Sequence, residues 1–200
     1  MDGPVLVLAS ASPRRRGLLS ALGVVIGRVQ PADIDESVHP GEEPVMYARR
    51  LACEKAAAVG QSGEVVLAAD TVVHADGTVY GKPRDDAHAR EILAGLSGRW
   101  HGVTTGWCVR VVGTGDDGAQ SGTVTARVRF RDLTPAMVAA YVRTGEGRDK
   151  AGSYGVQGLG AALVAEVQGS TSTVVGLPLD AVLAALAEVG IEAYEPERAG

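Results

Sequence analysis

The sequence predicts an α/β fold in which helices flank a mixed β-sheet. Short apolar runs alternate with segments that begin with helix-capping signals. Two longer β-rich runs, at 100–112 and 123–131, flank a loop of ordinary turn composition and predict a hairpin. Hydrophobic residues make up 46% of the 200 residues and charged residues only 22%, so the chain can bury a sizeable core.

Apolar periodicity and turn residues place the individual elements. Short apolar runs predict strands at 5–9, 24–29, 64–70, 78–80, 100–112, 123–131 and 161–167. Capping residues and apolar spacing predict five helices. The first begins at Pro13 after a cap at Ser12, and the second spans 44–59 and ends before Gly60. The others are capped by Asp85, Thr134 and Asp180; they end at Leu96 and span 135–142 and 181–189, respectively.

The remaining segments predict loops within a single domain. The glycine-rich stretch 144–160 is expected to form one long loop. No repeat, linker or low-complexity tract divides the chain, so we expect one domain over 1–200, with a frayed polar tail at 192–200.

Charge and cysteine content restrict the partners and the compartment. A formal net charge of −5 argues against general nucleic-acid binding, because such proteins normally present a basic surface. Cys53 and Cys108 are the only cysteines and form no CxxC motif, which favours a reducing cytoplasm. No stretch resembles a signal peptide or approaches the roughly 20 apolar residues of a membrane span. We therefore expect a cytoplasmic protein that binds neither nucleic acid nor membrane.

The stretch SASPRRRGLL, residues 10–19, places three arginines in the first turn of a helix. Cations are disfavoured there by roughly 0.3–1 kcal/mol each, because the helix macrodipole is positive at that end. The free backbone N–H groups of a helix start bind anions, and arginine guanidinium groups grip phosphate oxygens in pairs. The stretch therefore indicates a phosphate site. The alternative is a solvated basic turn in which Ser12 acts only as a cap.

Two acidic segments could complete a site for phosphates. Asp70 is expected to end an apolar strand, and ligands bind at the carboxyl ends of strands in open α/β sheets. The segment DIDE contributes a second cluster that includes Glu36. Carboxylates from two loops that face arginines are what a Mg²⁺-assisted phosphate site requires. A turn residue at Asp70 and a plain acidic loop are the alternatives.

Two lysines fit the same site. Lys55 borders the apolar face of the helix expected at 44–59, where it either reaches the site or extends its ammonium group to solvent. Lys82 lies in the turn YGKP, where a solvated lysine is usual. The sequence lacks GxxxxGK[ST], HxxxH, HExxH and GxSxG, which argues against a P-loop, a histidine-based zinc site and a serine hydrolase.

The chain carries in order the motifs LASASPRRRGLL, DESV, LACEKA, AADTVV, GKP, KAGSYGVQG and GSTSTVVGLPL. With these it resembles the Maf family from about Val5 to Ala187. The resemblance implies a nucleoside triphosphate pyrophosphatase, which cuts between the α- and β-phosphates and depends on Mg²⁺ or Mn²⁺. It also implies a fold similar to the inosine triphosphate pyrophosphatases, with two lobes around a cleft, and a homodimer. The alternatives are a nucleotide-binding regulator of cell division with little turnover and another phosphohydrolase.

The resemblance also implies roles for individual residues. It places the phosphates at Ser10, Arg14 and Arg15 and the triphosphate against Lys55 and Lys82. It places the metal and the attacking water at Glu36 and Asp70, with Asp70 as the proton acceptor.

The same resemblance bears on the base of the substrate. Thr71 and Gln157 match members that act on dTTP and UTP rather than on 7-methyl-GTP, and an amide can pair with O4 and N3–H of thymine or uracil. The last motif departs from the family pattern at Thr171, where an aromatic residue is common, and at Thr173, where asparagine is usual.

Overall fold

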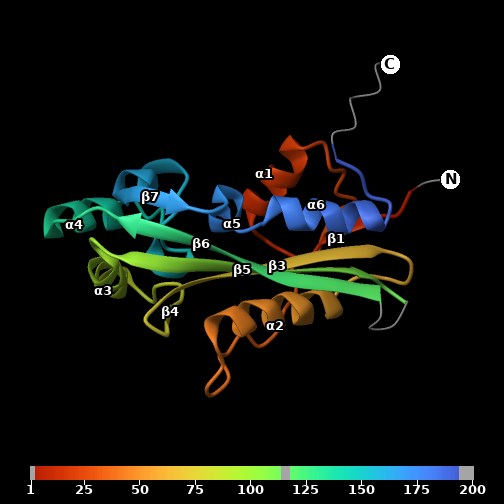
Figure 1. Cartoon of the computed structure of the whole chain (residues 1–200), viewed down its shortest axis with the longest axis horizontal. Coiled ribbons are helices and arrows are strands. Elements are labelled where there is room, and N and C mark those ends of the chain that lie inside the picture. Colours follow the sequence, from red (N-terminus) through yellow and green to blue (C-terminus); the bar gives the residue numbers. More distant parts are fainter. Residues whose placement is uncertain (1–2, 114–117, 194–200) are drawn as a thin grey trace.

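The computed structural model describes residues 3–113 and 118–193 (Figure 1). The strands are β1 (Leu6–Leu8), β2 (Arg28–Val29), β3 (Val65–Ala75), β4 (Thr78–Tyr80), β5 (Trp100–Val111), β6 (Ala119–Phe130) and β7 (Val164–Gln168). The helices are α1 (Pro13–Ala21), α2 (Pro44–Ala57), α3 (Asp86–Leu96), α4 (Pro135–Arg143), α5 (Thr171–Val175) and α6 (Leu179–Glu188). The glycine-rich segment contains two short 3₁₀ turns, η2 (Ala151–Ser153) and η3 (Gly158–Leu163).

The strands of the described ranges form one mixed sheet of seven strands. Their order is β2-β1-β3-β5-β6-β7, and β4 pairs with β3 beside this path. β1 is parallel to β2 and to β3, whereas the other pairs are antiparallel, including the predicted hairpin of β5 and β6. The predicted α/β class with a mixed, helix-flanked sheet is therefore confirmed.

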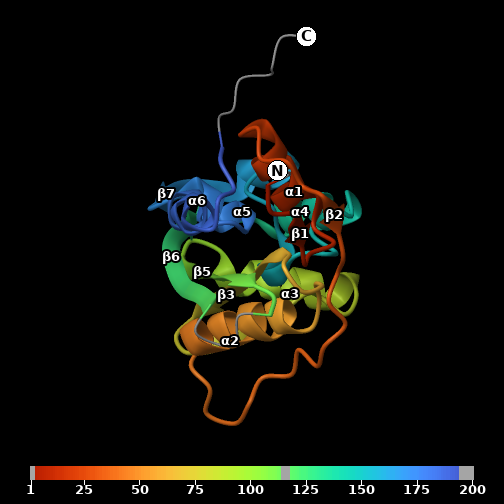
Figure 2. The ribbon, with the colours of Figure 1, turned by 90° about the vertical axis from the view of Figure 1, so that its right-hand side faces the viewer.

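Helices cover both faces of the sheet (Figure 2). α2 lies on one face, where Ala52 and Ala56 pack with Val66 of β3. α1 and α6 lie on the opposite face, where Leu19 and Leu186 pack with the odd-numbered side chains of β3 and β5. Among the helices of the described ranges, none is both long and apolar enough to cross a bilayer.

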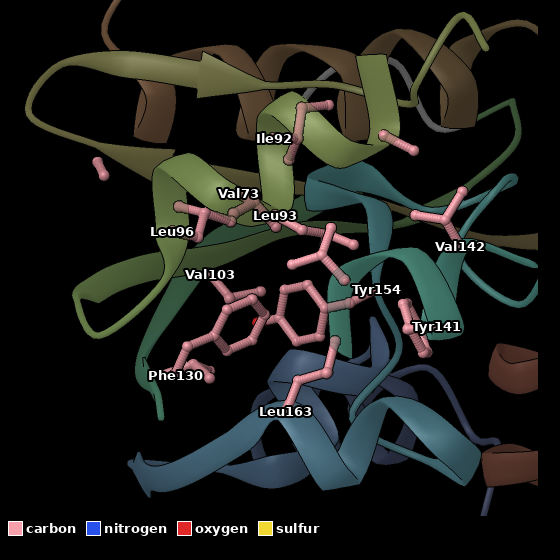
Figure 3. Close-up of a cluster of buried hydrophobic side chains, with 14 residues drawn as sticks. Val73, Ile92, Leu93, Leu96, Val103, Phe130, Tyr141, Val142, Tyr154 and Leu163 are labelled. Atoms are coloured by element: carbon pink, nitrogen blue, oxygen red, sulfur yellow. The ribbon is translucent and has the colours of Figure 1, made fainter. Parts of the chain in front are cut away.

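A separate apolar cluster, formed mainly by α3, α4 and the neighbouring strands, fills the other end of the sheet (Figure 3). At its centre the rings of His101, Phe130 and Tyr154 pack edge to face, with centroids 4.7–5.5 Å apart. The Tyr154 hydroxyl lies 2.8 Å from Nε2 of His101, so each of these two atoms has a partner inside the core. Burial lowers the pKa of His101 to about 4, so its ring is neutral at pH 7.

One edge of β3 is interrupted. β5 pairs with β3 from Val65 to His74, but on the other side β1 covers only Val65 to Leu67 and β4 only Val73 to Ala75. Within the described residues, 68–72 therefore have a strand partner on the β5 side alone. The prediction that the strand ends at Asp70 is wrong, because pairing with β5 carries β3 on to Ala75. The strand that ends near this point is the neighbouring β1, whose pairing with β3 stops at Leu67.

The predicted helix starts agree with the structure in three of the four capped cases. The confirmed caps, whose side chains each accept a hydrogen bond from the backbone N–H three residues ahead, are Ser12, Asp85 and Thr134. The predicted cap at Asp180 is wrong, because α6 already begins at Leu179 after Pro178. Asp180 lies instead in the first turn, where the macrodipole favours a carboxylate.

Several element lengths differ from the sequence-based expectation. The strand expected at 24–29 shrinks to β2, because its ladder partner is the three-residue β1. β6 starts at Ala119, earlier than expected, because its pairing follows β5 back to Arg110. The short α5 was not predicted, and the residues 114–117 of the hairpin loop and 194–200 of the tail lie outside the described ranges.

The contact between α2 and β5 provides a test of the packing. A Cβ atom at Gly106 of β5 would lie 2.2 Å from the carbonyl oxygen of Ala48 in α2. We expect Gly106→Ala to destabilise the fold by about 1–3 kcal/mol, because α2 would have to move off the sheet. The control is Gly95→Ala in α3, where a Cβ meets nothing within 4 Å and should stabilise by roughly 0.5–1 kcal/mol. Denaturant unfolding measures both, and equal effects would contradict the close approach.

Candidate active site

A cleft of about 510 Å³ opens at the interrupted edge of β3. It is bordered by the turn after β1, the acidic loop before α2, the turn after β4 and the glycine-rich segment. The structure brings together in its lining all of the residues predicted for the site, which are Ser10, Arg14, Arg15, Glu36, Lys55, Asp70, Thr71, Lys82 and Gln157.

Lys55 is the centre of the charged part of the cleft. Its Nζ lies 2.6 Å from Oδ1 of Asp70 and 2.6 Å from Oε1 of Glu36. The side chain is contributed by the buried face of α2 and is only 8% exposed, so the alternative of a solvent-directed lysine is wrong. A buried ammonium group needs such partners, because its desolvation is otherwise unfavourable.

The charges around Glu36 keep it ionised. Burial opposes ionisation, but the hydrogen bond and charge of Lys55 outweigh it, with smaller contributions from Lys82 and Arg15. The pKa of Glu36 therefore lies below its ordinary value. This carboxylate is negatively charged at neutral pH, as a ligand of a cation must be.

The donor set of the cleft suits a hard divalent cation. Two carboxylates, Asp70 and Glu36, converge on one nitrogen, and each has its second oxygen without a hydrogen bond to any described residue. Mg²⁺ is commonly held by one or two carboxylates together with substrate phosphates and water. In the described part of the chain, no three side chains of His, Cys, Asp or Glu gather into a protein-only cage. The residues therefore fit an ion that is bound partly by these carboxylates and partly by the oxygens of a phosphate.

Arg15 is held on the other side of the cleft by three hydrogen bonds. Its Nη1 donates to Oγ of Ser10 at 2.9 Å, its Nη2 to Oγ1 of Thr71 at 3.1 Å, and its Nε to the carbonyl oxygen of Gly176 at 2.7 Å. Burial lowers the pKa of Arg15, while the charge of Asp70 acts in the opposite direction. A guanidinium fixed in this way presents a positive charge to the cleft without an ion-pair partner of its own among the described residues.

The three arginines of the PRRR segment have different environments. Arg14 donates from Nη1 to Oδ2 of the exposed Asp149 at 3.3 Å, which links α1 to the glycine-rich segment. Arg16 is exposed and lies outside the cleft lining. The alternative of a uniformly solvated basic turn is therefore wrong for Arg15.

The loop that carries Glu36 is fastened to α2 by residues that the sequence analysis did not identify. The Tyr47 hydroxyl donates to the carbonyl oxygen of Glu36 at 2.7 Å. Arg50 donates from Nε and Nη2 to the two carboxylate oxygens of Glu42, both at 2.7 Å, and also to the carbonyl oxygen of Ser37 at 2.9 Å. α2 thus positions both Lys55 and its partner Glu36. These contacts leave no capping or charge-pair pattern in the sequence, because such patterns depend on the regular spacing of a helix or strand and the loop has none.

The other end of the cleft is apolar. Val73, Val103 and Tyr154 line it and belong to the cluster of Figure 3. Lys82 and Gln157 border the same cleft, and neither side chain forms a hydrogen bond within the described ranges. The cleft therefore combines a charged end with an apolar end, and the Gln157 side chain is part of its lining.

Replacement of Glu42 tests how the acidic loop is held. Arg50 lowers the pKa of Glu42 from 4.5 to about 2, so this carboxylate adds stability above pH 4.5 that is lost as the pH falls towards 2. We expect Glu42→Gln to lack this part of the acid dependence and to show faster amide hydrogen exchange at residues 36–39. Thermal unfolding against pH and exchange mass spectrometry measure the two effects. Glu54→Gln is the control, because Glu54 is a half-buried residue of α2 itself that also binds Arg50, at 3.2 Å. Equal exchange in both variants would contradict the role of Glu42.

The family of the chain follows from its similarity to known proteins. Residues 5–189 match the family model described as Maf-like protein. A protein named dTTP/UTP pyrophosphatase from Anaeromyxobacter sp. (strain Fw109-5) is 56% identical over 175 residues, which is 87% of this chain and 84% of that protein. A protein of the same name from Aquifex aeolicus (strain VF5) is 43% identical over 192 residues, covering 93% of this chain and 96% of its own length. With its motifs, its mixed sheet and its charged cleft, the chain belongs to the Maf-like family.

Proposed function

We propose that this protein hydrolyses dTTP and UTP to the nucleoside monophosphate and pyrophosphate. The observation that carries the proposal is the convergence of Asp70 and Glu36 on Lys55 in a cleft that also contains the anchored Arg15. The similar proteins named dTTP/UTP pyrophosphatase match over most of their length and support the choice of substrates. The function is therefore that of a nucleoside triphosphate hydrolase acting at the α–β phosphoanhydride bond.

The cationic side chains bind the triphosphate. Arg15 uses three of its five N–H groups within the protein and retains two, one on each terminal nitrogen, for phosphate oxygens. Arg14 and Lys82 line the same cleft and balance the charge that develops on the leaving pyrophosphate. The start of α1, whose first N–H groups lack helical partners, adds to this positive potential.

Asp70 acts as the general base. Its carboxylate accepts a proton from the water that attacks the α-phosphorus, and the bond to the bridging oxygen breaks as the new P–O bond forms. Lys55 orients the carboxylate through its contact with Oδ1 and leaves Oδ2 for the water. We propose Mg²⁺ or Mn²⁺ as the cofactor, with Glu36 and Asp70 as its ligands. Such an ion neutralises phosphate charge and lowers the pKa of coordinated water.

The apolar end of the cleft receives the base. Val73, Val103 and Tyr154 provide an apolar surface, and the Gln157 amide can donate to O4 and accept from N3–H of thymine or uracil. Family resemblance and the two free thiols support two further proposals, a homodimer and a cytoplasmic location. Light scattering of the purified protein tests the first of these.

A screen of nucleoside triphosphates tests the function. We expect pyrophosphate release from dTTP and UTP with Mg²⁺ or Mn²⁺, and clearly slower release from GTP and 7-methyl-GTP. Guanine also offers an acceptor and a donor at O6 and N1–H, but its two-ring base places that edge farther from the sugar than O4 and N3–H of a pyrimidine, and the similar proteins are named for dTTP and UTP. The assay must separate pyrophosphate from orthophosphate. Preference for a purine would overturn the base assignment, orthophosphate as the product would indicate another phosphohydrolase, and binding without turnover would indicate a regulator.

Asp70→Asn tests the general base. The change keeps the size of the side chain but removes its basicity, so kcat should fall by about 10² to 10⁴. The fold should persist, because Lys55 retains its contact with Glu36. Turnover, the thermal midpoint and nucleotide binding are measured on one preparation. Asp33→Asn, an exposed residue of the acidic loop outside the cleft lining, is the control. Turnover close to wild type with a lowered midpoint would make Asp70 a structural residue.

A further inference from the structure

We propose that Thr105 is a positioning residue that holds Arg15 in place through a chain of hydrogen bonds. Thr105 lies on β5 directly opposite Thr71 of β3, is fully buried, and does not line the cleft. Nη2 of Arg15 lies 3.1 Å from Oγ1 of Thr71, the two threonine hydroxyls lie 2.9 Å apart, and Oγ1 of Thr105 lies 2.8 Å from the carbonyl oxygen of Thr173. The proposal rests on the proposed function, because it assigns Arg15 to the phosphates.

The chemistry of the groups determines the direction of every bond in this chain. The carbonyl oxygen of Thr173 can only accept, so Thr105 donates its single hydroxyl proton there. Thr105 can then only accept from Thr71, which must donate its own proton. The guanidinium of Arg15 can only donate, so Thr71 accepts from it. All the bonds therefore run one way, from Arg15 to α5, and bonds arranged in this way polarise and strengthen one another.

The hydrogen-bond chain through the two threonines and a second, direct contact both hold Arg15 against the same short segment. Nε of Arg15 donates to the carbonyl oxygen of Gly176, which caps α5, while the threonine chain ends on Thr173 inside α5. The packing there is close, since a Cβ atom at Gly176 would lie 3.2 Å from Oγ1 of Thr71 and 3.3 Å from Nε of Arg15. Thr105 thus connects the guanidinium of Arg15, through Thr71, to the same short segment whose Gly176 carbonyl holds Nε.

This arrangement also changes the role of Thr71. Its only hydroxyl proton is committed to Thr105, so Thr71 has no proton to donate to a substrate. Thr71 therefore acts on the phosphates by orienting Arg15, and recognition of the base is left to Gln157 and the apolar end of the cleft.

Substitution of two adjacent threonines separates positioning from general stability. Thr105→Val keeps the shape of the side chain but removes the hydroxyl from the hydrogen-bond chain. It should lower kcat/KM for dTTP by about tenfold or more, mainly through KM, and weaken inhibition by pyrophosphate similarly, because the Thr71 hydroxyl that accepts from Arg15 loses its own acceptor and no longer fixes the guanidinium. Thr105→Ser should restore both. Thr104→Val is the matched control: Thr104 is equally buried and bonds to His74 and Thr125 but not to the chain, so it should leave both constants near wild type.

A double variant tests whether Thr105 acts through Arg15. Because Thr105 acts through Arg15, Thr105→Val should change nothing further in an Arg15→Ala protein. The proposal is overturned if Thr105→Val behaves like Thr104→Val, or if its effect persists at full size without Arg15. If Thr105→Val does not fold, Thr71→Val breaks the same chain and must give the same loss. If the wild-type protein releases no pyrophosphate from any nucleotide, the proposed function fails, and the thermal shift produced by added pyrophosphate still compares the variants.

Discussion

The short length of β1 is the constraint on which the site depends. Because β1 ends at Leu8 while β3 continues to Ala75, one edge of the sheet has an opening before β4 begins. Successive strand residues point to opposite faces, so Asp70 and Thr71 would belong to different sides of a continuous sheet. At the opening both line one cleft, where Asp70 meets a lysine from α2 and Thr71 meets an arginine from α1.

The two halves of the site are stabilised in different ways. The half around Lys55 depends on ion pairing. Two carboxylates compensate the charge of the buried Lys55 ammonium, and the acidic loop is held by an ion pair with Arg50. The half around Arg15 depends on neutral groups, namely hydroxyl and carbonyl oxygens. An arginine bound only to neutral acceptors keeps its full charge for an incoming anion, whereas a lysine bound to two carboxylates has little net charge left to offer. This difference agrees with the proposed roles, in which the α1 side attracts the phosphates and the α2 side activates the water.

The sequence predicted what depends on local interactions. The caps at Ser12, Asp85 and Thr134, and the membership of the cleft, follow from short motifs and their resemblance to a family. The strand end at Asp70 was misplaced because strand length is set by partners distant in the sequence. The contacts of Tyr47, Arg50 and Thr105 were missed because they are made through space. The departure from the family pattern at Thr173 affects the site little, since its backbone carbonyl makes the contact and its buried hydroxyl has no partner in the described part of the chain.

The hydrogen bond between Arg15 and Gly176 joins residues 161 positions apart in the sequence. Ordering the ends of such a long loop is entropically unfavourable until the intervening sheet has formed. During synthesis, Arg15 emerges from the ribosome early and its acceptor carbonyl very late, so a nascent chain contains the PRRR segment for most of its synthesis without this hydrogen bond. If Arg15 binds phosphate as proposed, competence to bind a triphosphate therefore arises only once the segment up to Gly176 has been made and folded.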